Sequence, residues 1–151
     1  MAEGIAQSWV STGAGKHLAR RKKLGTAPEM ALRRAVHARG LRYRVNVALS
    51  KSCRPDLLFR RGKVAVFVDG CFWHGCPRHG RSTFSGPNRA LWEAKLRRNR
   101  RSDDHADLAA RQLGFAVVRI WECEVRLALA AALERIEVAV SGINQRGTHA
   151  T

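Results

Sequence analysis

The spacing of apolar and polar residues predicts alternating helices and strands. Apolar positions recur at helical spacing in three segments, alternate strictly in one and run continuously in two others, which is typical of amphipathic helices, a half-buried strand and fully buried strands. We expect helices over residues 26–40, 88–112 and 124–140, and strands over residues 41–47, 56–59, 64–68 and 115–121. The order helix, three strands, helix, strand, helix predicts an α/β fold with helices around one mixed sheet.

The ends of these elements suggest how the chain is divided. Thr26 can cap the first helix, with Pro28 in the first turn and Glu29 three residues after the cap, and Gly40 ends the helix. Residues 1–25 are rich in Gly, Ser, Lys and Arg and show little periodicity. We therefore expect a basic arm over 1–25, one domain over 26–140 and a flexible tail over 141–151.

Charge changes the picture more than composition does. The 151 residues are 45% hydrophobic, which is ordinary for a globular domain, but the net charge is +16. The first 63 residues hold 15 of the 28 Lys and Arg residues and only 3 of the 12 Asp and Glu residues. Such an excess points to a polyanionic partner, and we expect nucleic acid.

A membrane partner is not expected. The longest apolar stretch, Leu127 to Leu133, is far shorter than the roughly 20 residues that a spanning helix needs. The first ten residues contain no charged-then-apolar secretory signal. We therefore expect a cytoplasmic protein whose four cysteines stay reduced and act as metal ligands or core residues.

Three cysteines and a histidine have spacings suited to a structural zinc site. Cys71, Cys76 and His79 lie in a Gly-rich loop, and Cys123 follows the last strand. Four such ligands complete a tetrahedral zinc site, which would hold a loop of low apolar content in shape. His74 is a rival fourth ligand, buried unligated cysteines are the alternative, and Cys53 is left as a spare thiol.

Carboxylates at strand ends suggest a magnesium site. If the strands over 56–59 and 64–68 form a hairpin, Asp56 meets the end of the strand that finishes at Asp69. Mg²⁺ prefers such oxygen ligands and can stabilise a phosphodiester in reaction and activate water. Asp56 could instead cap a turn after Pro55. Glu29 could join the metal site or serve the capping box alone.

Two further residues could act beside that site. His74 follows Asp69 closely in the sequence, and an imidazole there could pass protons to or from water or a leaving oxygen. Asp103, on the second helix, could orient it. The alternatives are a surface or zinc-binding role for His74 and a solvated helix surface for Asp103.

Aromatic residues cluster around the same loop. Phe72 and Trp73 follow Cys71 directly, and Trp92 begins the next helix. Apolar rings can wedge between base pairs, at a cost of a few kcal/mol of unstacking per step. Packing around the zinc loop is the alternative for all three.

Taken together, these residues resemble one known family. The resemblance rests on Thr26-x-Pro28-Glu29, Arg54-Pro55-Asp56, the stretch Val66 to Pro77 (VFVDGCFWHGCP), Asn99 with Asp103, and Val118 to Cys123 (VRIWEC). Over about residues 16–126 the chain resembles the very-short-patch-repair (Vsr) DNA mismatch endonucleases. The resemblance implies a three-layer, restriction-endonuclease-like PD-(D/E)XK fold without the usual catalytic Lys. It also implies a strand-specific nick 5′ to the thymine of a T:G mismatch, which arises by deamination of 5-methylcytosine.

The resemblance also implies roles for individual residues. Asp56 and the main-chain carbonyl of Val68 would bind Mg²⁺, His74 would transfer protons with Asp103 as its partner, and Glu29 would be the first-helix acid near the metal. The zinc ligands would be Cys71, Cys76, His79 and Cys123. Phe72, Trp73 and Trp92 would wedge into the mismatch from the major groove, and Leu18 would lie on the minor-groove side. The phosphate contacts that we expect from the basic arm are Lys16, Arg20, Arg21, Lys22 and Lys23.

The chain departs from the family pattern at two positions. Asp69 stands where some members carry His, and Cys53 stands where Gly is usual. The expected partner is double-stranded DNA with a T:G mismatch, bound by a monomer in the bacterial nucleoid. A non-catalytic, zinc-stabilised DNA-binding module of the same fold is the alternative function, and a basic RNA-binding protein is a third.

Overall fold

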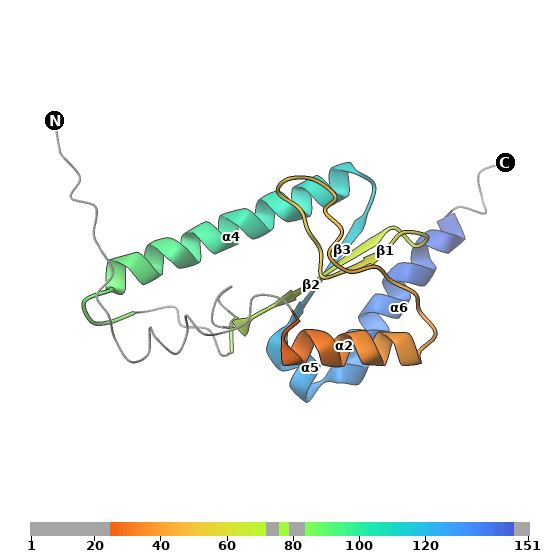
Figure 1. Ribbon diagram of the computed structural model, residues 1–151, viewed down its shortest axis with the longest axis horizontal. Helices are drawn as coiled ribbons and strands as arrows, with labels where there is room; N and C mark the ends of the chain where they lie inside the picture. Colours follow the sequence, from red (N-terminus) through yellow and green to blue (C-terminus); the bar gives the residue numbers. More distant parts are fainter. Residues whose placement is uncertain (1–24, 72–75, 79–83, 147–151) are drawn as a thin grey trace.

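The computed structural model describes residues 25–71, 76–78 and 84–146. Three strands form one mixed sheet, with helices on both faces (Figure 1). The helices are α2 (Ala27–Ala38), α4 (Arg89–Gln112), α5 (Glu122–Leu127) and α6 (Leu129–Arg146), and the strands are β1 (Leu57–Phe59), β2 (Val64–Asp69) and β3 (Ala116–Trp121). The predicted α/β architecture, a mixed sheet flanked by helices, is confirmed.

Strand pairing brings the candidate site to one edge of the sheet. The strands lie in the order β1-β2-β3, with β1 antiparallel and β3 parallel to β2. Leu57 pairs with Val66, so the start of β1 lies beside the end of β2. Asp69 pairs with Trp121, so β2 and β3 end at the same edge. The crossover between these parallel strands contains α4.

The alternation of β2 side chains explains its continuous apolar run. Val64 and Val66 belong to the core formed with α2, α5 and α6, whereas Ala65 and Phe67 pack with Ala106 and Ala110 of α4. All four β2 side chains are buried because both faces of the sheet are covered. Burying one side chain of Val or Phe size stabilises a fold by roughly 1.5–3 kcal/mol, so this strand anchors the fold.

The start of α2 follows the predicted capping pattern with one difference. The Thr26 hydroxyl accepts from the Glu29 N–H at 3.4 Å, as a capping residue does. The Glu29 carboxylate, however, accepts from the N–H of Gly25, one residue before the cap, at 3.1 Å. Gly40 has a φ of +80°, a conformation that glycine adopts freely, and it follows the helix end as predicted.

The strand predicted over residues 41–47 was wrong. Only Arg44 bridges to Leu58 there, through two backbone hydrogen bonds of 2.9 and 2.8 Å. Asn46 has a φ of +57°, which turns the chain away from the sheet before a ladder can form. The alternation of apolar and polar residues nevertheless predicts correctly which side chains turn inward, since Leu41 and Tyr43 are partly buried against the core.

The last predicted helix, over residues 124–140, is in fact two helices. Ala128, with φ −145° and ψ 47°, leaves the helical conformation and separates α5 from α6. α5 begins at Glu122 rather than Glu124, and α6 continues to Arg146 rather than ending at Val140. The break contains neither Gly nor Pro, so the sequence offers no local signal for it.

Candidate active site and metal centre

Asp56 lies where the predicted hairpin was expected to place it, beside the end of β2. Its Oδ2 accepts a hydrogen bond from the Val68 N–H at 2.7 Å, and its own N–H donates to the Val66 carbonyl at 2.9 Å. The antiparallel register of β1 and β2 therefore fixes both the backbone and the carboxylate of Asp56. The two residues expected to bind magnesium, Asp56 and Val68, are in direct contact.

The carboxylates around Asp56 create a strongly negative site. Burial raises the pKa of Asp56 to about 6, and the charges of Glu29 and Asp69 add to the rise. The Val68 N–H and the Arg33 guanidinium oppose it. A buried carboxylate with two acidic neighbours is destabilised when ionised, and a divalent cation would relieve that repulsion.

Glu29 serves more than the helix cap. Its side chain is buried, with a relative exposure of 3% for the residue, and it forms an ion pair with Arg33 one turn later. Because its charge also acts on Asp56, Glu29 belongs to the same acid cluster. The two roles expected of Glu29 are therefore compatible: its carboxylate accepts from the Gly25 N–H, and its charge acts on Asp56.

Arg119 of β3 organises a second group of acids and was not predicted from the sequence. Its guanidinium donates to both oxygens of Asp69 at 2.8 and 3.0 Å, and to Asp107 at 2.8 Å. It also lies over the Phe67 ring, 4.4 Å from the centroid. Burial lowers the pKa of Arg119, but its hydrogen bond to Asp107 and the charges of Asp69 and Asp103 outweigh that effect and raise it.

Asp103 contacts Arg119, a partner that the sequence did not predict. The Asp103 backbone carbonyl accepts from Arg119 at 3.1 Å, and its carboxylate lies 3.6 Å from the same guanidinium. His74, its expected partner, lies outside the described residues. Asp103 is thus no solvated helix-surface acid, since it faces the sheet beside Asp69.

Three of the four expected zinc ligands come together. The sulfurs of Cys71, Cys76 and Cys123 all lie within 4.8 Å of one another, and those of Cys76 and Cys123 are 3.7 Å apart. Two thiolates bound tetrahedrally at 2.3 Å from one zinc ion would lie about 3.8 Å apart, so the donor set fits zinc. The fourth expected ligand, His79, lies outside the described residues.

The local fold explains why these cysteines meet. The Cys76 N–H donates to the Cys71 carbonyl at 3.0 Å, and Cys123 lies in the first turn of α5, directly after β3. Because β2 and β3 are parallel, residues that follow the two strands lie at one edge of the sheet. Burial and the neighbouring thiols raise the pKa of Cys71 to about 12, as expected for a thiol cluster without a cation.

Cys53 does not belong to this cluster. It is 1% exposed and packs with Leu58, Phe67 and Ala110 in the core beneath α4. Burial raises the pKa of its thiol, and the charge of Asp107 adds to the rise. The prediction of a spare thiol is confirmed, and its role is packing.

Trp92 has an aromatic partner that the sequence did not single out. Its ring stacks on Phe84, with centroids 6.2 Å apart and an interplanar angle of 15°, and the Lys95 ammonium lies 5.9 Å from the ring centroid. Phe84 and Trp92 are both partly buried, and their stacked rings lie next to the first turn of α4. The other expected DNA contacts lie outside the described residues, namely Phe72, Trp73, Leu18, Lys16, Arg20, Arg21, Lys22 and Lys23.

Among the described residues, no helix combines the length and apolar character needed to cross a membrane.

The surface that the structure does describe is strongly basic in places, with exposed Arg34, Arg42 and Arg44 on and just after α2. These exposed arginines agree with a protein that meets a polyanion.

Comparison with known proteins defines the class. The model of the DNA mismatch endonuclease Vsr family matches residues 12–79, which include the acid cluster and most of the cysteines. The nicking enzyme V.NaeI of Lentzea aerocolonigenes, a type II nicking enzyme, is 37% identical over 140 residues, covering 89% of this chain and 83% of the relative. The chain belongs to the Vsr family of DNA endonucleases.

Two further relatives show the breadth of the match. The type II nicking enzyme V.NmeDIP of Neisseria meningitidis serogroup C is 42% identical over 119 residues, covering 79% of this chain and 80% of the relative. The DNA mismatch endonuclease Vsr of Escherichia coli strain K12 is 31% identical over 136 residues, covering 82% of this chain and 85% of the relative. The relatives thus carry the names of nicking enzymes and of a mismatch endonuclease, and this chain shares their family.

Proposed function

We propose that this protein is a magnesium-dependent endonuclease that nicks one strand of duplex DNA 5′ to the thymine of a T:G mismatch and so begins very short patch repair. The observation that carries the proposal is the buried Asp56 carboxylate, which is held by the Val68 N–H and has a pKa raised by burial and by the charges of Glu29 and Asp69. Family membership supports it, because the relatives include both nicking enzymes and a mismatch endonuclease. The sheet with helices on both faces agrees with a restriction-endonuclease-like fold.

The acid cluster suits phosphodiester hydrolysis. Asp56 and the Val68 carbonyl would hold Mg²⁺, with Glu29 acting directly or through water. When bound, Mg²⁺ would supply charge stabilisation for the reacting phosphate and a water of lowered pKa. The water oxygen would form a bond to phosphorus and give up a proton, while the bond to the leaving sugar oxygen would break and that oxygen would take up a proton.

Proton transfer is the part we assign to His74. The imidazole would exchange protons with the water or the leaving oxygen, and Asp103 would orient it. Arg119 supports this arrangement, since it fixes Asp103 through both the backbone carbonyl and the carboxylate. Asp103 is therefore held on the side of α4 that faces the sheet, next to Asp69.

The experiment that tests the proposed function uses duplexes that differ at one base pair. T:G, T:A and C:G duplexes, labelled on either strand, are incubated with the protein and Mg²⁺ or with EDTA. We expect a single nick 5′ to the mismatched thymine, only on that strand and only with Mg²⁺. Equal nicking of the matched duplexes would refute mismatch specificity, and binding without nicking would favour the non-catalytic module.

Zinc binding has a separate prediction. With Cys71, Cys76, His79 and Cys123 as ligands, the purified protein should contain about one zinc ion per chain. Cys123→Ser should lower both zinc content and melting temperature, whereas Cys53→Ser, which alters the thiol outside the cluster, should leave zinc content unchanged. Metal analysis by mass spectrometry checks both variants. A zinc-free protein of full stability would contradict the site.

Mismatch selectivity should depend on the aromatic wedge. A T:G pair is stacked less well than a Watson–Crick pair, and Phe72 and Trp73 follow zinc ligand Cys71 directly, so a stapled loop would hold both rings rigid. Because unstacking costs a few kcal/mol per step, Trp73→Ala should reduce the preference for T:G over matched DNA by roughly tenfold. Competition binding measures this preference. Full discrimination by a zinc-loaded Trp73→Ala variant would assign Trp73 to packing.

A further inference from the structure

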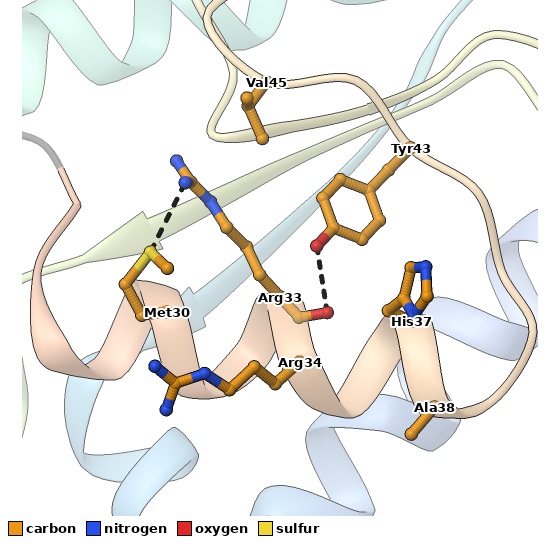
Figure 2. A pocket seen from close by; sticks show the side chains of 7 residues that line it. All are labelled: Met30, Arg33, Arg34, His37, Ala38, Tyr43 and Val45. Atoms are coloured by element: carbon orange, nitrogen blue, oxygen red, sulfur yellow. Dashed lines mark hydrogen bonds between the residues drawn. The ribbon is translucent and has the colours of Figure 1, made fainter.

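A depression lies along α2 (Figure 2). Its volume is about 430 Å³, and it lies between α2 and the segment that follows that helix. Met30, Arg33, Arg34 and His37 line it from α2, and Tyr43 and Val45 line it from the following segment. We call it the α2 groove.

The α2 groove has an apolar floor and a basic rim. Its α2 residues recur every three or four positions, so they form one stripe along the helix. The Tyr43 hydroxyl donates to the Arg33 carbonyl at 3.0 Å, which holds the opposite wall against α2. Arg34 and His37 are exposed, and Arg42 adds a guanidinium that donates to the His37 carbonyl at 3.5 Å. This combination suits a ligand with an apolar body and negative charges.

Arg33 connects the α2 groove to the acid cluster. It forms the ion pair with Glu29, and its Nη1 donates to the Met30 sulfur at 3.4 Å. Within the described part of the chain, the Arg33 Nε is buried and has no hydrogen-bond partner. Because the Arg33 Nε is out of reach of a ligand, the charge that this face offers comes from the exposed Arg34 and His37.

We propose that the α2 groove seats the sugar–phosphate backbone of the DNA duplex next to the nicked bond. The inference rests on the proposed function, because it assigns a binding subsite for the same substrate. From Met30 to Ala38, the first and last α2 residues that line the groove, the helix rises about 12 Å. The groove is therefore long enough for more than one phosphate of a strand. Deoxyribose fits the apolar floor, and the phosphates meet the basic rim.

Charge favours DNA over the other occupants. Three arginines and a histidine lie on or beside the groove, whereas its lining residues include no acid. An apolar protein partner or a second copy of this chain, with a net charge of +16, would not complement such a rim. The groove also lies on the helix that carries Glu29, because Arg33 lines it and pairs with that acid.

Salt dependence of binding tests the electrostatic part. Binding to a T:G duplex of about 20 base pairs is measured in EDTA, where no nicking occurs. Arg34→Gln should lower the slope of log K against log salt by about 0.9 and weaken binding roughly eightfold at 0.1 M salt. The matched control is Arg60→Gln, because Arg60 lies in the β1–β2 turn at the opposite end of β2 from Asp69, roughly 17 Å away. We expect this control to keep the wild-type slope.

A second variant tests occupancy without changing charge. Val45→Trp should fill the groove and weaken duplex binding by at least fivefold, with the salt slope also reduced as the backbone is displaced. Its melting temperature and zinc content show that it folds. Wild-type slope and affinity in both folded variants, Arg34→Gln and Val45→Trp, would overturn the proposal. If the wild type self-associates and Val45→Trp abolishes that self-association, the groove binds a second copy of the chain. This result would overturn the proposal as well.

Failure of this inference differs from failure of the proposed function. The binding measurement needs no catalysis, so a wild-type protein that binds but does not nick would refute only the function. Conversely, the wild type could nick T:G duplexes while the Arg34→Gln and Val45→Trp variants both bind DNA with wild-type affinity. That result would refute only the role of the α2 groove.

Discussion

Asp56→Asn should abolish nicking and, in the absence of metal, make the protein more stable. The carboxylate is a proposed magnesium ligand, and losing several kcal/mol of metal-assisted stabilisation lowers the rate by roughly a thousandfold. In the metal-free protein the same carboxylate is buried beside Glu29 and Asp69, which raises its pKa to about 6. Asn removes that repulsion and keeps an oxygen that can accept from the Val68 N–H.

The stability gain should depend on pH in a defined direction. The pKa of Asp56 is raised from 3.8 in the unfolded chain to about 6, so the folded state binds the extra proton between these values. Wild-type stability therefore falls as pH rises through this window and stays lowered above it. At pH 7 we expect Asp56→Asn to gain on the order of 2 kcal/mol, and below pH 4 almost nothing.

Thermal unfolding in EDTA at pH 4 and pH 7 measures this gain. A difference of that size raises the melting temperature by roughly 4–8 °C for a chain of this length. Asp104→Asn is the matched control, because Asp104 is an exposed acid on α4 and should leave stability and nicking unchanged. An Asp56→Asn variant that is less stable than the wild type at pH 7 would show that the carboxylate is not repelled in the folded protein.

Arg119→Met should cause the largest loss of stability among the variants discussed. The guanidinium joins β3 to Asp69 on β2 and to Asp103 and Asp107 on α4. Its removal takes two hydrogen bonds and a positive charge from Asp69, which is 5% exposed. Breaking one side of such a pair costs about 3–5 kcal/mol, and the partial exposure of Arg119 brings our expectation to about 2–4 kcal/mol. Arg119→Lys should recover only part of the lost stability, since Lys lacks the planar guanidinium that can donate to both oxygens of a carboxylate.

A double-mutant cycle with Asp69→Asn separates charge from packing. Removing both partners leaves no uncompensated charge between them, so Asp69→Asn/Arg119→Met should be more stable than Arg119→Met alone. Denaturant unfolding of the four proteins gives the interaction energy. If Arg119→Met costs less than about 0.5 kcal/mol, the ion-pair network is a surface feature and our assignment of Arg119 is wrong.

The sequence predicted the parts of the site that depend on strand register. Asp56 and the strand ending at Asp69 were placed together because an apolar hairpin with a short turn has few other registers, and the cysteines met because two parallel strands end at one edge. Arg119 was missed because it lies in an otherwise apolar strand. The alternation of side chains along a strand shows which face of the sheet a residue lies on, but not which residues it contacts. Nothing in the spacing shows that Asp69, Asp103 and Asp107 converge on it.

Backbone irregularities were the other limit. The alternation over residues 41–47 identified which side chains turn inward, but the positive φ of Asn46 allows only one bridge to the sheet. The same irregular segment carries Tyr43 and Val45 across α2 and forms one wall of the α2 groove. A regular edge strand would have continued the sheet, so the departure from prediction creates the site that we assign to DNA.

The central claim is that Asp56 holds the metal on which nicking depends. Its most direct test is the Mg²⁺ concentration dependence of single-turnover nicking of a T:G duplex by the wild type and by Asp56→Asn, with Asp104→Asn as the control. We expect the wild type and the control to share one half-saturating Mg²⁺ concentration. The Asp56→Asn variant should show no nicking at that concentration and at most a weak rate at far higher Mg²⁺. Equal half-saturation in all three proteins would contradict the account, because the metal would then bind without Asp56.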